Sequence, residues 1–158
     1  MMLKKVVSGG QTGADEGGLI AAKKAGLETG GYVPKGFITE YGPNPDLGRT
    51  YGLVETVSSN YVPRTYANAK LGDGTIRFAT DFTSRGEIVT LDGIAKYNKP
   101  YIDVHVSNPC PISDVVRWIK DNNIEVLNVA GNRESTSPGI QEFVVYFLEK
   151  VFKELMGE

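Results

Sequence analysis

The sequence predicts an α/β fold, with a mostly parallel sheet and helices on both of its faces. Short apolar segments alternate with longer amphipathic segments along the chain, and this alternation is typical of parallel sheets covered by helices. Glycine accounts for 19 of the 158 residues, about twice its usual frequency, and many glycines stand where a strand would give way to a helix. No repeat, low-complexity segment or linker divides the chain, so we expect a single domain over residues 1–158.

The N-terminal half is predicted to contain three short strands, two helices and one long loop. Apolar spacing and turn signals place the strands at residues 6–7, 28–33 and 53–55, and the helices at residues 14–26 and 61–70. Ser59 and Asn60 are suited to cap the second helix. The Gly- and Pro-rich passage from Pro34 to Asp46 is too polar for a regular element, and loops of this length are often functional.

The C-terminal half is predicted to continue the alternation. Strands are expected at residues 75–79, 101–104 and 125–129, and helices at residues 86–97, 113–122 and 138–155. In the first of these helices, one face carries Ile88, Leu91, Ile94 and Ala95. Ser137 is expected to cap the last helix, because the following Pro138 is favoured in a first turn.

Composition and charge exclude several classes of function. The formal net charge is −2 and the Lys and Arg residues are dispersed, so we expect no nucleic acid partner. The first residues do not resemble a signal peptide, and no apolar run is long enough to span a membrane. The one cysteine, Cys110, excludes an intrachain disulfide and fits a reducing compartment. We therefore predict a cytoplasmic protein without a membrane partner.

The first candidate site is the segment Gly9-Gly10-Gln11-Thr12-Gly13-Ala14-Asp15, directly after the first predicted strand. Its glycines allow a sharp turn with exposed amides, Thr12 adds a hydroxyl donor, and the following helix dipole favours an anion. The segment lacks the Gly-Lys-Ser/Thr of a Walker loop and the third glycine of the dinucleotide fingerprint. We therefore predict a phosphate-binding loop of another kind. The alternative is a tight turn with an aspartate in the first helical turn.

Two further polar loops follow predicted strands. In Thr80-Asp81-Phe82-Thr83-Ser84-Arg85-Gly86, Arg85 is a candidate anion ligand, and Thr90 lies one turn further on. The hydroxyls of Thr83 and Ser84 are equally suited to cap the next helix. In Gly131-Asn132-Arg133-Glu134-Ser135, the charged pair Arg133 and Glu134 could contact a ligand, although the segment also fits an ordinary connecting loop. Because parallel strands end at one edge of their sheet, we expect all three loops to meet there.

Other polar residues are weaker candidates. Arg64 and Asn68 are four positions apart, so they share a helix face that could border the same crevice, and Lys35 follows the second strand. His105 and Cys110 lack the spacing of metal ligands, so we predict no directly bound metal. No arrangement of the Ser-His-Asp or Cys-His kind indicates a catalytic set.

The residues of these loops resemble a known family. The resemblance is carried by Val7-Ser8-Gly9-Gly10-Gln11-Thr12-Gly13-Ala14-Asp15, Gly31-Tyr32-Val33-Pro34-Lys35-Gly36, Arg64-Thr65 with Asn68, Asp73-Gly74-Thr75, Ser84 to Thr90, and Val129-Ala130-Gly131-Asn132-Arg133-Glu134-Ser135. Together these segments are similar to the putative molybdenum carrier family, also described as circularly permuted YpsA-like, within the lysine-decarboxylase-like and DNA-processing Rossmann superfamily. The resemblance spans nearly the whole chain.

The resemblance implies a Rossmann-like three-layer sandwich that binds a nucleotide or cofactor and forms a homo-oligomer, a dimer or a tetramer. The implied ligand is a small phosphorylated molecule, either a pterin, with molybdenum cofactor as the named candidate, or a nucleotide-like compound. The binding residues carried over are Gly9, Gly10, Gln11, Thr12, Gly13 and Asp15 in the first loop and Gly131, Asn132, Arg133, Glu134 and Ser135 in the third. From the second loop we add Thr83, Ser84, Arg85, Gly86 and Thr90.

The same comparison yields one departure and one alternative function. Arg85, in Ser84-Arg85-Gly86-Glu87, replaces a glycine of the family pattern and could clasp a phosphate or narrow the pocket. Related phosphoribohydrolases, which cleave nucleotide N-glycosidic bonds, use Pro-Gly-Gly-x-Gly-Thr-x-x-Glu, and residues 8–16 are similar but have Ser8 for proline and exchange Thr and Gly. In such an enzyme, Asp15 or Glu16 would stabilise oxocarbenium-like charge and Arg133 would hold the phosphate. The lack of a recognisable catalytic set favours a carrier or binding protein.

Overall fold

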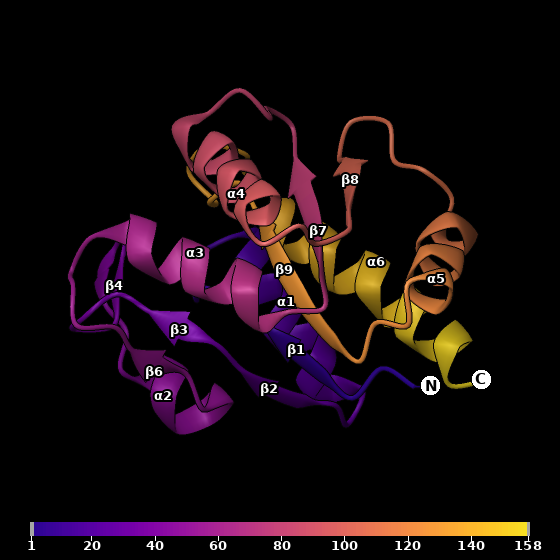
Figure 1. Ribbon diagram of the computed structural model, residues 1–158, viewed down its shortest axis with the longest axis horizontal. Helices are drawn as coiled ribbons and strands as arrows, with labels where there is room; N and C mark the ends of the chain where they lie inside the picture. Colours follow the sequence, from indigo (N-terminus) through magenta and orange to yellow (C-terminus); the bar gives the residue numbers. More distant parts are fainter. Residues whose placement is uncertain (1, 158) are drawn as a thin grey trace.

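A five-stranded sheet forms the centre of the protein in the computed structural model, which describes residues 2–157 (Figure 1). Across the sheet, the strands are β2 (Glu28–Gly30), β1 (Lys5–Val7), β9 (Val126–Gly131), β7 (Gly74–Ala79) and β8 (Tyr101–His105). Every pairing between them is parallel. The last strand of the chain therefore occupies the centre of the sheet, between the first strand and β7.

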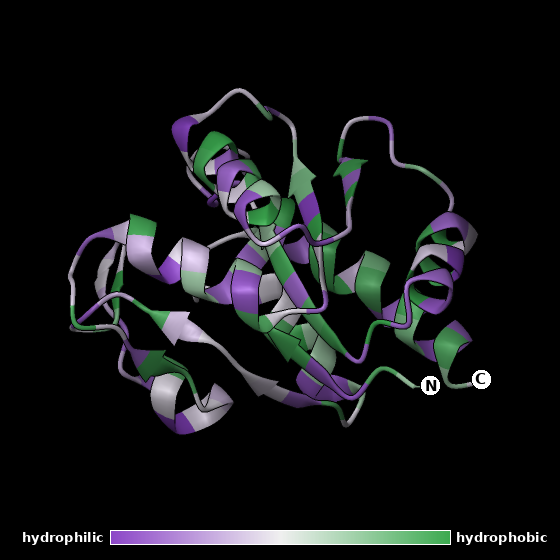
Figure 2. Cartoon of the chain, in the orientation of Figure 1, coloured by the Kyte–Doolittle hydropathy of each residue, from purple (hydrophilic) through white to green (hydrophobic). Residues whose placement is uncertain are grey.

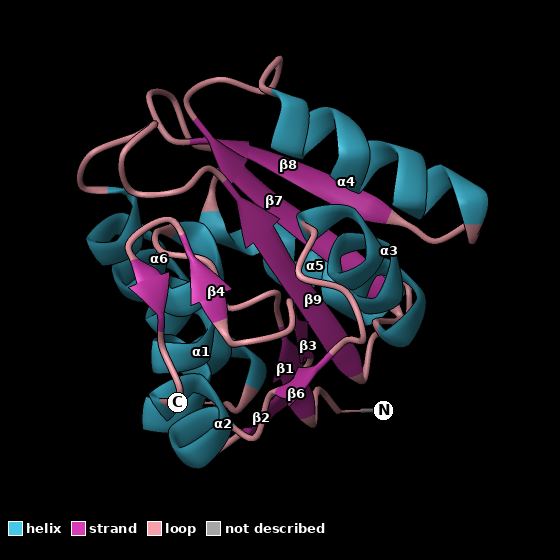
Figure 3. Cartoon of the chain, turned by 90° about the vertical axis from the view of Figure 1, so that its left-hand side faces the viewer, coloured by secondary structure: helices cyan, strands magenta, loops and turns pink. Residues whose placement is uncertain are grey.

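Helices cover both faces of this sheet. On one face lie α1 (Ala14–Lys24), α5 (Ile112–Asp121) and α6 (Ile140–Leu155), and on the other lie α3 (Tyr61–Leu71) and α4 (Arg85–Lys96). Figure 3 shows the sheet between the α1–α6 layer and the α3–α4 layer. The arrangement confirms the predicted Rossmann-like three-layer sandwich. Among residues 2–157, no helix is both long and apolar enough to cross a membrane.

The face of the sheet under α1, α5 and α6 is apolar. Ile76 and Phe78 of β7, together with Leu127 and Val129 of β9, belong to the main apolar core with residues of these helices. The hydropathy colouring of Figure 2 shows this concentration of apolar residues on β9 and α6. Burial of large apolar side chains on this side supplies the main favourable free energy of folding.

The opposite face of the same strands is polar although it is also buried. Side chains alternate along a strand, and the face toward α3 and α4 carries three buried polar residues, Thr75, Arg77 and Asn128. Asn128 Nδ2 donates to Thr75 Oγ1 at 3.1 Å. Central strands covered by helices are usually apolar on both sides. Polar residues at these positions therefore indicate that this face serves something other than packing.

Helix α4 has a matching polar side. Its buried residues are Glu87, Thr90, Gly93 and Ile94. Of the predicted apolar face only Ile94 is buried, whereas Ile88 and Leu91 are 52% and 37% exposed and Ala95 is exposed as well. The apolar pattern does not mark the inward side of this helix, because that side borders a polar cavity rather than an apolar core.

Residues 28–33, predicted as one strand, form two. β2 ends at Gly30, and β3 (Tyr32–Val33) leaves the main sheet to pair with β6 (Val54–Glu55). The break falls at Gly31, whose φ of 124° is rarely adopted by other residues, and a Cβ there would lie 2.3 Å from the carbonyl oxygen of Ser8. The chain can turn this close to the end of β1 only because residue 31 is a glycine.

The Gly- and Pro-rich passage, predicted to lack regular elements, contains several. β4 (Ile38–Thr39) and β5 (Gly42–Pro43) form an antiparallel hairpin, and α2 (Asp46–Tyr51) follows. Leu47 of α2 packs with Val33 and with Leu19 of α1 in a second, smaller apolar cluster. The prediction was wrong because contacts with distant residues, rather than local propensity, stabilise these short elements.

The last helix begins two residues later than predicted, and Ser137 does not cap it. The Ser137 hydroxyl donates instead to Asn132 Oδ1 at 2.8 Å. The carboxylate of Glu134 accepts hydrogen bonds from the amides of Gly139 and Gln141, at 2.6 and 3.1 Å. A negative charge here satisfies two amides that lack helical partners and complements the helix dipole. Glu134 therefore takes the role that the sequence assigned to Ser137.

We expect Glu134→Ala to lower the free energy of unfolding by about 1–2 kcal/mol, because the first turn of α6 loses its carboxylate. Urea unfolding measures the difference. Glu154→Ala, at the exposed far end of the same helix, is the matched control and should stay within about 0.5 kcal/mol of wild type. Wild-type stability of Glu134→Ala would contradict the capping role.

Candidate functional site

The loops that follow β1, β7 and β9 meet at one edge of the sheet, as predicted. With α3 and the first turns of α4 they enclose a cavity of about 470 Å³. Its lining includes Asn128, from the polar side of β9. A cavity of this size falls in the range of small-molecule sites, and it lies where parallel α/β sheets bind ligands, beyond the carboxyl ends of the strands.

Most of the predicted binding residues line this cavity. Those in the lining are Gly9, Gln11 and Asp15 from the first loop, Ser84, Arg85, Gly86 and Thr90 from the second, and Gly131, Asn132, Arg133 and Ser135 from the third. Outside the lining are Gly10, Thr12, Gly13, Thr83, Glu134 and Glu16. The first loop therefore borders the cavity only at Gly9, Gln11 and Asp15 rather than along its whole length.

The amides of the first loop are used within the protein. From residue 10 to residue 14, they donate in turn to Ser8 Oγ, Asp15 Oδ2, Gln11 Oε1, Gln141 Oε1 and the carbonyl oxygen of Asn132. A donor that is already paired is not free for a ligand. These amides therefore do not form the anion cradle that the sequence predicted, and the loop borders the cavity through Gly9 and the side chains of Gln11 and Asp15.

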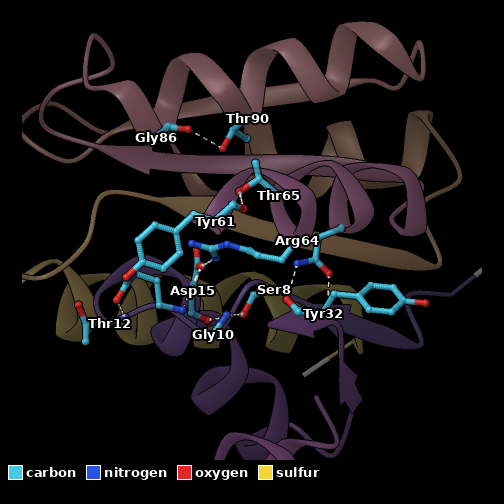
Figure 4. A network of polar contacts seen from close by, with 12 residues as sticks. Ser8, Gly10, Thr12, Asp15, Tyr32, Tyr61, Arg64, Thr65, Gly86 and Thr90 are labelled. Carbon is cyan, nitrogen blue, oxygen red and sulfur yellow. Dashed lines mark hydrogen bonds and ion pairs between the residues drawn. The ribbon is translucent and has the colours of Figure 1, made fainter. Parts of the chain in front are cut away.

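A buried ion pair between Asp15 and Arg64 forms one wall of the cavity (Figure 4). Arg64 Nη1 lies 3.1 Å from Asp15 Oδ2, and the Arg64 and Asp15 side chains are 10% and 7% exposed. The same oxygen accepts a hydrogen bond from the Gln11 amide at 3.2 Å. Burial raises the pKa of Asp15, while Arg64 and this amide act in the opposite direction. The pair joins α3 to the first turn of α1.

Gly9 provides the space for this ion pair. A Cβ at residue 9 would lie 1.7 Å from Arg64 Nη1 and 2.8 Å from Cζ. The guanidinium therefore rests directly against the backbone of the first loop, and no larger residue fits beneath it. The close approach that the sequence predicted at this glycine is made by an arginine of the protein itself.

Tyr61 contacts two arginines at the α3 side of the cavity. Its ring centroid lies 5.1 Å from Cζ of Arg64 and 5.4 Å from Cζ of Arg133, distances typical of cation–π contacts. Figure 4 shows the Tyr61 ring beside the Arg64 guanidinium. Neither Arg133 nor Arg85 forms a salt bridge with another residue of the described range 2–157. Their positive charges are thus available to an anion in the cavity.

Glu87 places a second carboxylate in the cavity wall. The residue is 2% exposed and lies in the first turn of α4. Burial raises the pKa of Glu87 to about 7, and Asp15 acts in the same direction, while Arg77 and Asn132 oppose the shift. Within residues 2–157, only Asn132 Nδ2 donates to its side chain, at a long 3.5 Å from Oε2. This carboxyl group therefore changes its charge near neutral pH.

Arg77 supports this part of α4 from the sheet. Its Nε and Nη2 atoms donate to the two carboxylate oxygens of Asp103, each at 2.7 Å, the bidentate geometry that arginine favours with carboxylates. Nη1 donates to the backbone carbonyl of Glu87 at 3.1 Å. The polar face of the sheet thus holds the first turn of α4 in place.

The β4–β5 hairpin ties the first and third loops together through Glu40. Its carboxylate accepts hydrogen bonds from the hydroxyls of Thr12 and Ser135, and its amide donates to Gln11 Oε1 at 2.8 Å. Burial acts to raise the pKa of Glu40, but the hydrogen bonds from Ser135 and Thr12 lower it overall. Thr12, predicted as a donor to a ligand, donates to this carboxylate.

Asn132 fixes the second loop against the third. Its Oδ1 atom accepts hydrogen bonds from the amides of Thr80 and Asp81 at 3.0 and 3.2 Å, and its Nδ2 atom donates to the Asp81 carbonyl at 3.0 Å. Gly13, at φ 82°, packs against the same loop, where a Cβ would lie 2.5 Å from the carbonyl oxygen of Asn132. The three loops thus form one hydrogen-bonded frame around the cavity.

Three buried polar atoms have no hydrogen-bond partner in the part of the chain that the structure describes. They are Gln11 Nε2, Arg64 Nε and Glu87 Oε1, and all three residues line the cavity. Buried polar groups are nearly always paired in folded proteins. Two free donors and one free acceptor around one cavity therefore indicate a site for a polar ligand.

Several residues of this site were not predicted from the sequence, among them Tyr61, Asn128 and Glu87. Asn128 had a signal, because it is a polar residue between apolar neighbours in a predicted central strand. Glu87 had none, because a glutamate three residues after Ser84 has the spacing of a capping box. Within the described residues, no three His, Cys, Asp or Glu side chains are grouped so that they could hold a metal ion.

The fold and the cavity define a Rossmann-like α/β protein with a polar cleft at the carboxyl edge of its sheet. Residues 6–152 match the model of the circularly permutated YpsA SLOG family. The crystal structure of a putative molybdenum carrier protein from Syntrophus aciditrophicus is similar with a TM-score of 0.84 and 34% sequence identity, over 95% of this chain and 94% of that one. Among curated proteins, none matches this chain. The chain belongs to the circularly permutated YpsA SLOG family, and the resemblance inferred from the sequence is confirmed.

We expect Gly9→Ala to destabilise the protein by about 1–3 kcal/mol, because the added methyl group displaces the Arg64 guanidinium from Asp15. Gly86→Ala is the matched control: it lies in the same cavity lining, and a Cβ there meets nothing within 4 Å. That variant should be as stable as wild type or slightly more so, since alanine favours the helix. Urea unfolding compares the three proteins, and equal stability of both variants would contradict the close contact at Gly9.

The raised pKa of Glu87 predicts a stability that falls as pH rises. The pKa is about 7 in the folded protein against an ordinary 4.5, so between these values the folded state holds a proton that the unfolded state has lost. The free energy of unfolding then decreases with rising pH through this window. Glu87→Gln removes the titration and should be more stable than wild type above pH 7, by up to about 3 kcal/mol. Below pH 5 this advantage should vanish, and parallel pH profiles from urea unfolding would contradict the prediction.

Proposed function

We propose that the protein binds a phosphorylated pterin or nucleotide-like molecule in this cavity, as a carrier or binding protein, with molybdenum cofactor as the candidate cargo. One observation carries the proposal. Gln11 Nε2, Arg64 Nε and Glu87 Oε1 are buried without partners around a single cavity of ligand size. The three atoms are hidden from solvent in this structure, so small side-chain shifts would bring them to a ligand in the cavity. A phosphorylated heterocycle offers both the acceptors and the donors that they need.

The charges of the cavity support an anionic group on the ligand. Arg133 lines the cavity, is free of salt bridges within residues 2–157, and lies on the Tyr61 ring beside Arg64. Guanidinium groups bind phosphate oxygens through strong, charge-assisted hydrogen bonds. The Arg64 charge is already balanced by Asp15, so Arg133 is the stronger candidate for the phosphate.

The relative from Syntrophus aciditrophicus supports the molybdenum cofactor as cargo, since that protein is described as a putative molybdenum carrier. The cofactor is a phosphorylated pterin, so its chemistry matches the donors and the acceptor of the cavity. Molybdenum would then be carried on the pterin.

A binding role fits the site better than the phosphoribohydrolase alternative. Glu16, one carboxylate proposed for that chemistry, lies outside the cavity lining. Asp15, the other, is held in the buried pair with Arg64. A carboxylate that is engaged by a guanidinium is poorly placed to stabilise a ribosyl cation. We therefore propose that a nucleotide or pterin is bound and released without being cleaved.

We expect GMP and neopterin monophosphate to bind in isothermal titration, and Arg133→Ala to weaken both by about 10-fold or more, because a charge-assisted contact with the phosphate is lost. Arg117→Ala, an exposed arginine on α5, is the matched control and should bind as wild type does. Prolonged incubation with GMP should release no free base. Wild-type binding by Arg133→Ala would contradict the phosphate site, and sustained base release would contradict a carrier.

The cargo itself is tested with free molybdenum cofactor. Protein incubated with the cofactor and passed through a desalting column should retain equal molar amounts of molybdenum and pterin, with the pterin measured by fluorescence. Arg133→Ala should retain much less of both. Retention of molybdate alone, without pterin, would contradict the proposed cargo.

A further inference from the structure

Glu87 stands where a helix-capping glutamate would stand, but it does not cap. In a capping box, the glutamate reaches back to the amide of the N-cap residue three positions earlier. Ser84 is the N-cap residue of α4 and its side chain makes no capping bond. The Glu87 carboxylate instead lies in the cavity lining, 2% exposed, with Oε1 unpartnered. A glutamate that capped the helix in solvent would avoid the free-energy cost of burial. The burial of the Glu87 carboxylate therefore indicates that a ligand in the cavity provides its hydrogen-bond partner.

This carboxylate also excludes one usual ligand position. The N-terminus of a helix beyond a parallel strand commonly receives a phosphate, but at α4 a bound phosphate would meet Glu87. Asp15 raises the pKa of Glu87, so it also disfavours an anion beside Glu87, although Arg64 pairs with Asp15. The anionic part of a ligand is therefore favoured at Arg133, which lies on the Tyr61 ring and has a positive charge. The uncharged ring of the ligand is left facing Glu87.

We propose that Glu87 accepts two hydrogen bonds from the 2-amino and adjacent ring N–H groups of a 2-amino-4-oxopyrimidine ring, the edge that pterins and guanine share. The inference rests on the proposed function and deepens it by naming the ring that the cavity selects. A carboxylate has two oxygens spaced to accept from two neighbouring N–H groups. Such a pair supplies Oε1 with the partner that the protein does not provide.

The proposal predicts an order of affinity among nucleotides that carry the same phosphate. GMP offers both N–H groups to Glu87. IMP lacks the 2-amino group and offers one, while AMP places a ring nitrogen acceptor against the carboxylate. A site with a polar group placed to hydrogen-bond one ligand binds an analogue more weakly when the analogue leaves that group without a partner. Isothermal titration should therefore give GMP tighter than IMP, and IMP tighter than AMP, with GMP and AMP differing by about 10-fold or more. Neopterin monophosphate should fall with GMP.

Glu87→Gln tests the residue directly. The glutamine keeps the shape of the side chain but replaces one acceptor by an N–H donor, which meets a donor on the ring. GMP affinity should fall by about 10-fold or more and the preference for GMP over IMP should disappear. AMP affinity should rise, because the new N–H group can donate to the ring nitrogen of AMP. Asp92→Asn removes a carboxylate from the exposed side of the same helix and should retain the wild-type order. Circular dichroism confirms that both variants are folded.

The pH dependence of nucleotide affinity distinguishes an ionised Glu87 that accepts hydrogen bonds from a protonated Glu87 that donates one. Glu87 must be ionised to accept two hydrogen bonds, so the ratio of GMP to AMP affinity should rise between pH 5.5 and pH 8. AMP carries the same phosphate, so its titration cancels in the ratio. The groups around Glu87 are Asp15, Arg77, Asp103 and Asn132, and all of them remain in Glu87→Gln, whose ratio should be flat. A ratio that falls with pH would mean that protonated Glu87 donates to the ligand and would overturn the proposal.

The remaining outcomes distinguish this inference from the proposed function. If GMP, IMP and AMP bind wild type with equal affinity and Arg133→Ala weakens all of them, the phosphate site stands and the role of Glu87 is wrong. Equal loss of all three nucleotides in Glu87→Gln would likewise overturn the ring-edge role. If neither the nucleotides nor neopterin monophosphate binds at all, the proposed function fails with it.

Discussion

The guanidinium of Arg64 lies 3.1 Å from the carboxylate of Asp15, and both side chains are largely buried. The arrangement of the cavity depends on this contact. It joins α3, on one face of the sheet, to the first turn of α1, beyond the end of β1. A buried charge is tolerated when it is paired, and removal of one partner leaves the other uncompensated. Glycine is required at residue 9 because a Cβ there would displace the Arg64 guanidinium from Asp15.

Buried polar residues on the sheet form further pairs of this kind on the side that faces α3 and α4. Arg77 is paired with Asp103 and supports the first turn of α4, and Asn128 bonds to Thr75. These groups occupy positions where apolar residues would bury more hydrophobic surface, so the α3–α4 layer contributes less to folding than the α1–α6 layer. Proteins retain such locally unfavourable choices mainly at functional sites. The unpartnered atoms of the cavity belong to the first loop and to α3 and α4, the helices that cover this face, which is consistent with a ligand as their missing partner.

In the loops, the sequence predicted the location of the site but not the role of each residue. Alternating strands and helices were enough to place the three polar loops at one edge, because parallel topology leaves few alternatives. The role of each residue within a loop was harder to infer. Gly9 and Thr12 had the composition of a phosphate cradle, yet one accommodates Arg64 and the other donates to Glu40. Both partners come from segments far away in the sequence, and local pattern carries no information about them.

By itself, the sequence determined the fold class, the family, most of the strands and helices in their order along the chain, and the loops that border the cavity. Periodicity and glycine placement, which indicate the elements and loops, are local properties. Only the tertiary structure decided which side of α4 is buried, that Glu134 caps α6, and that Glu87 faces the cavity with an unpaired oxygen. Each of these depends on what a side chain meets across the fold. Hydrogen bonds and burial are decided by neighbours in space, and a spacing such as that of Ser84 and Glu87 is compatible with more than one set of neighbours.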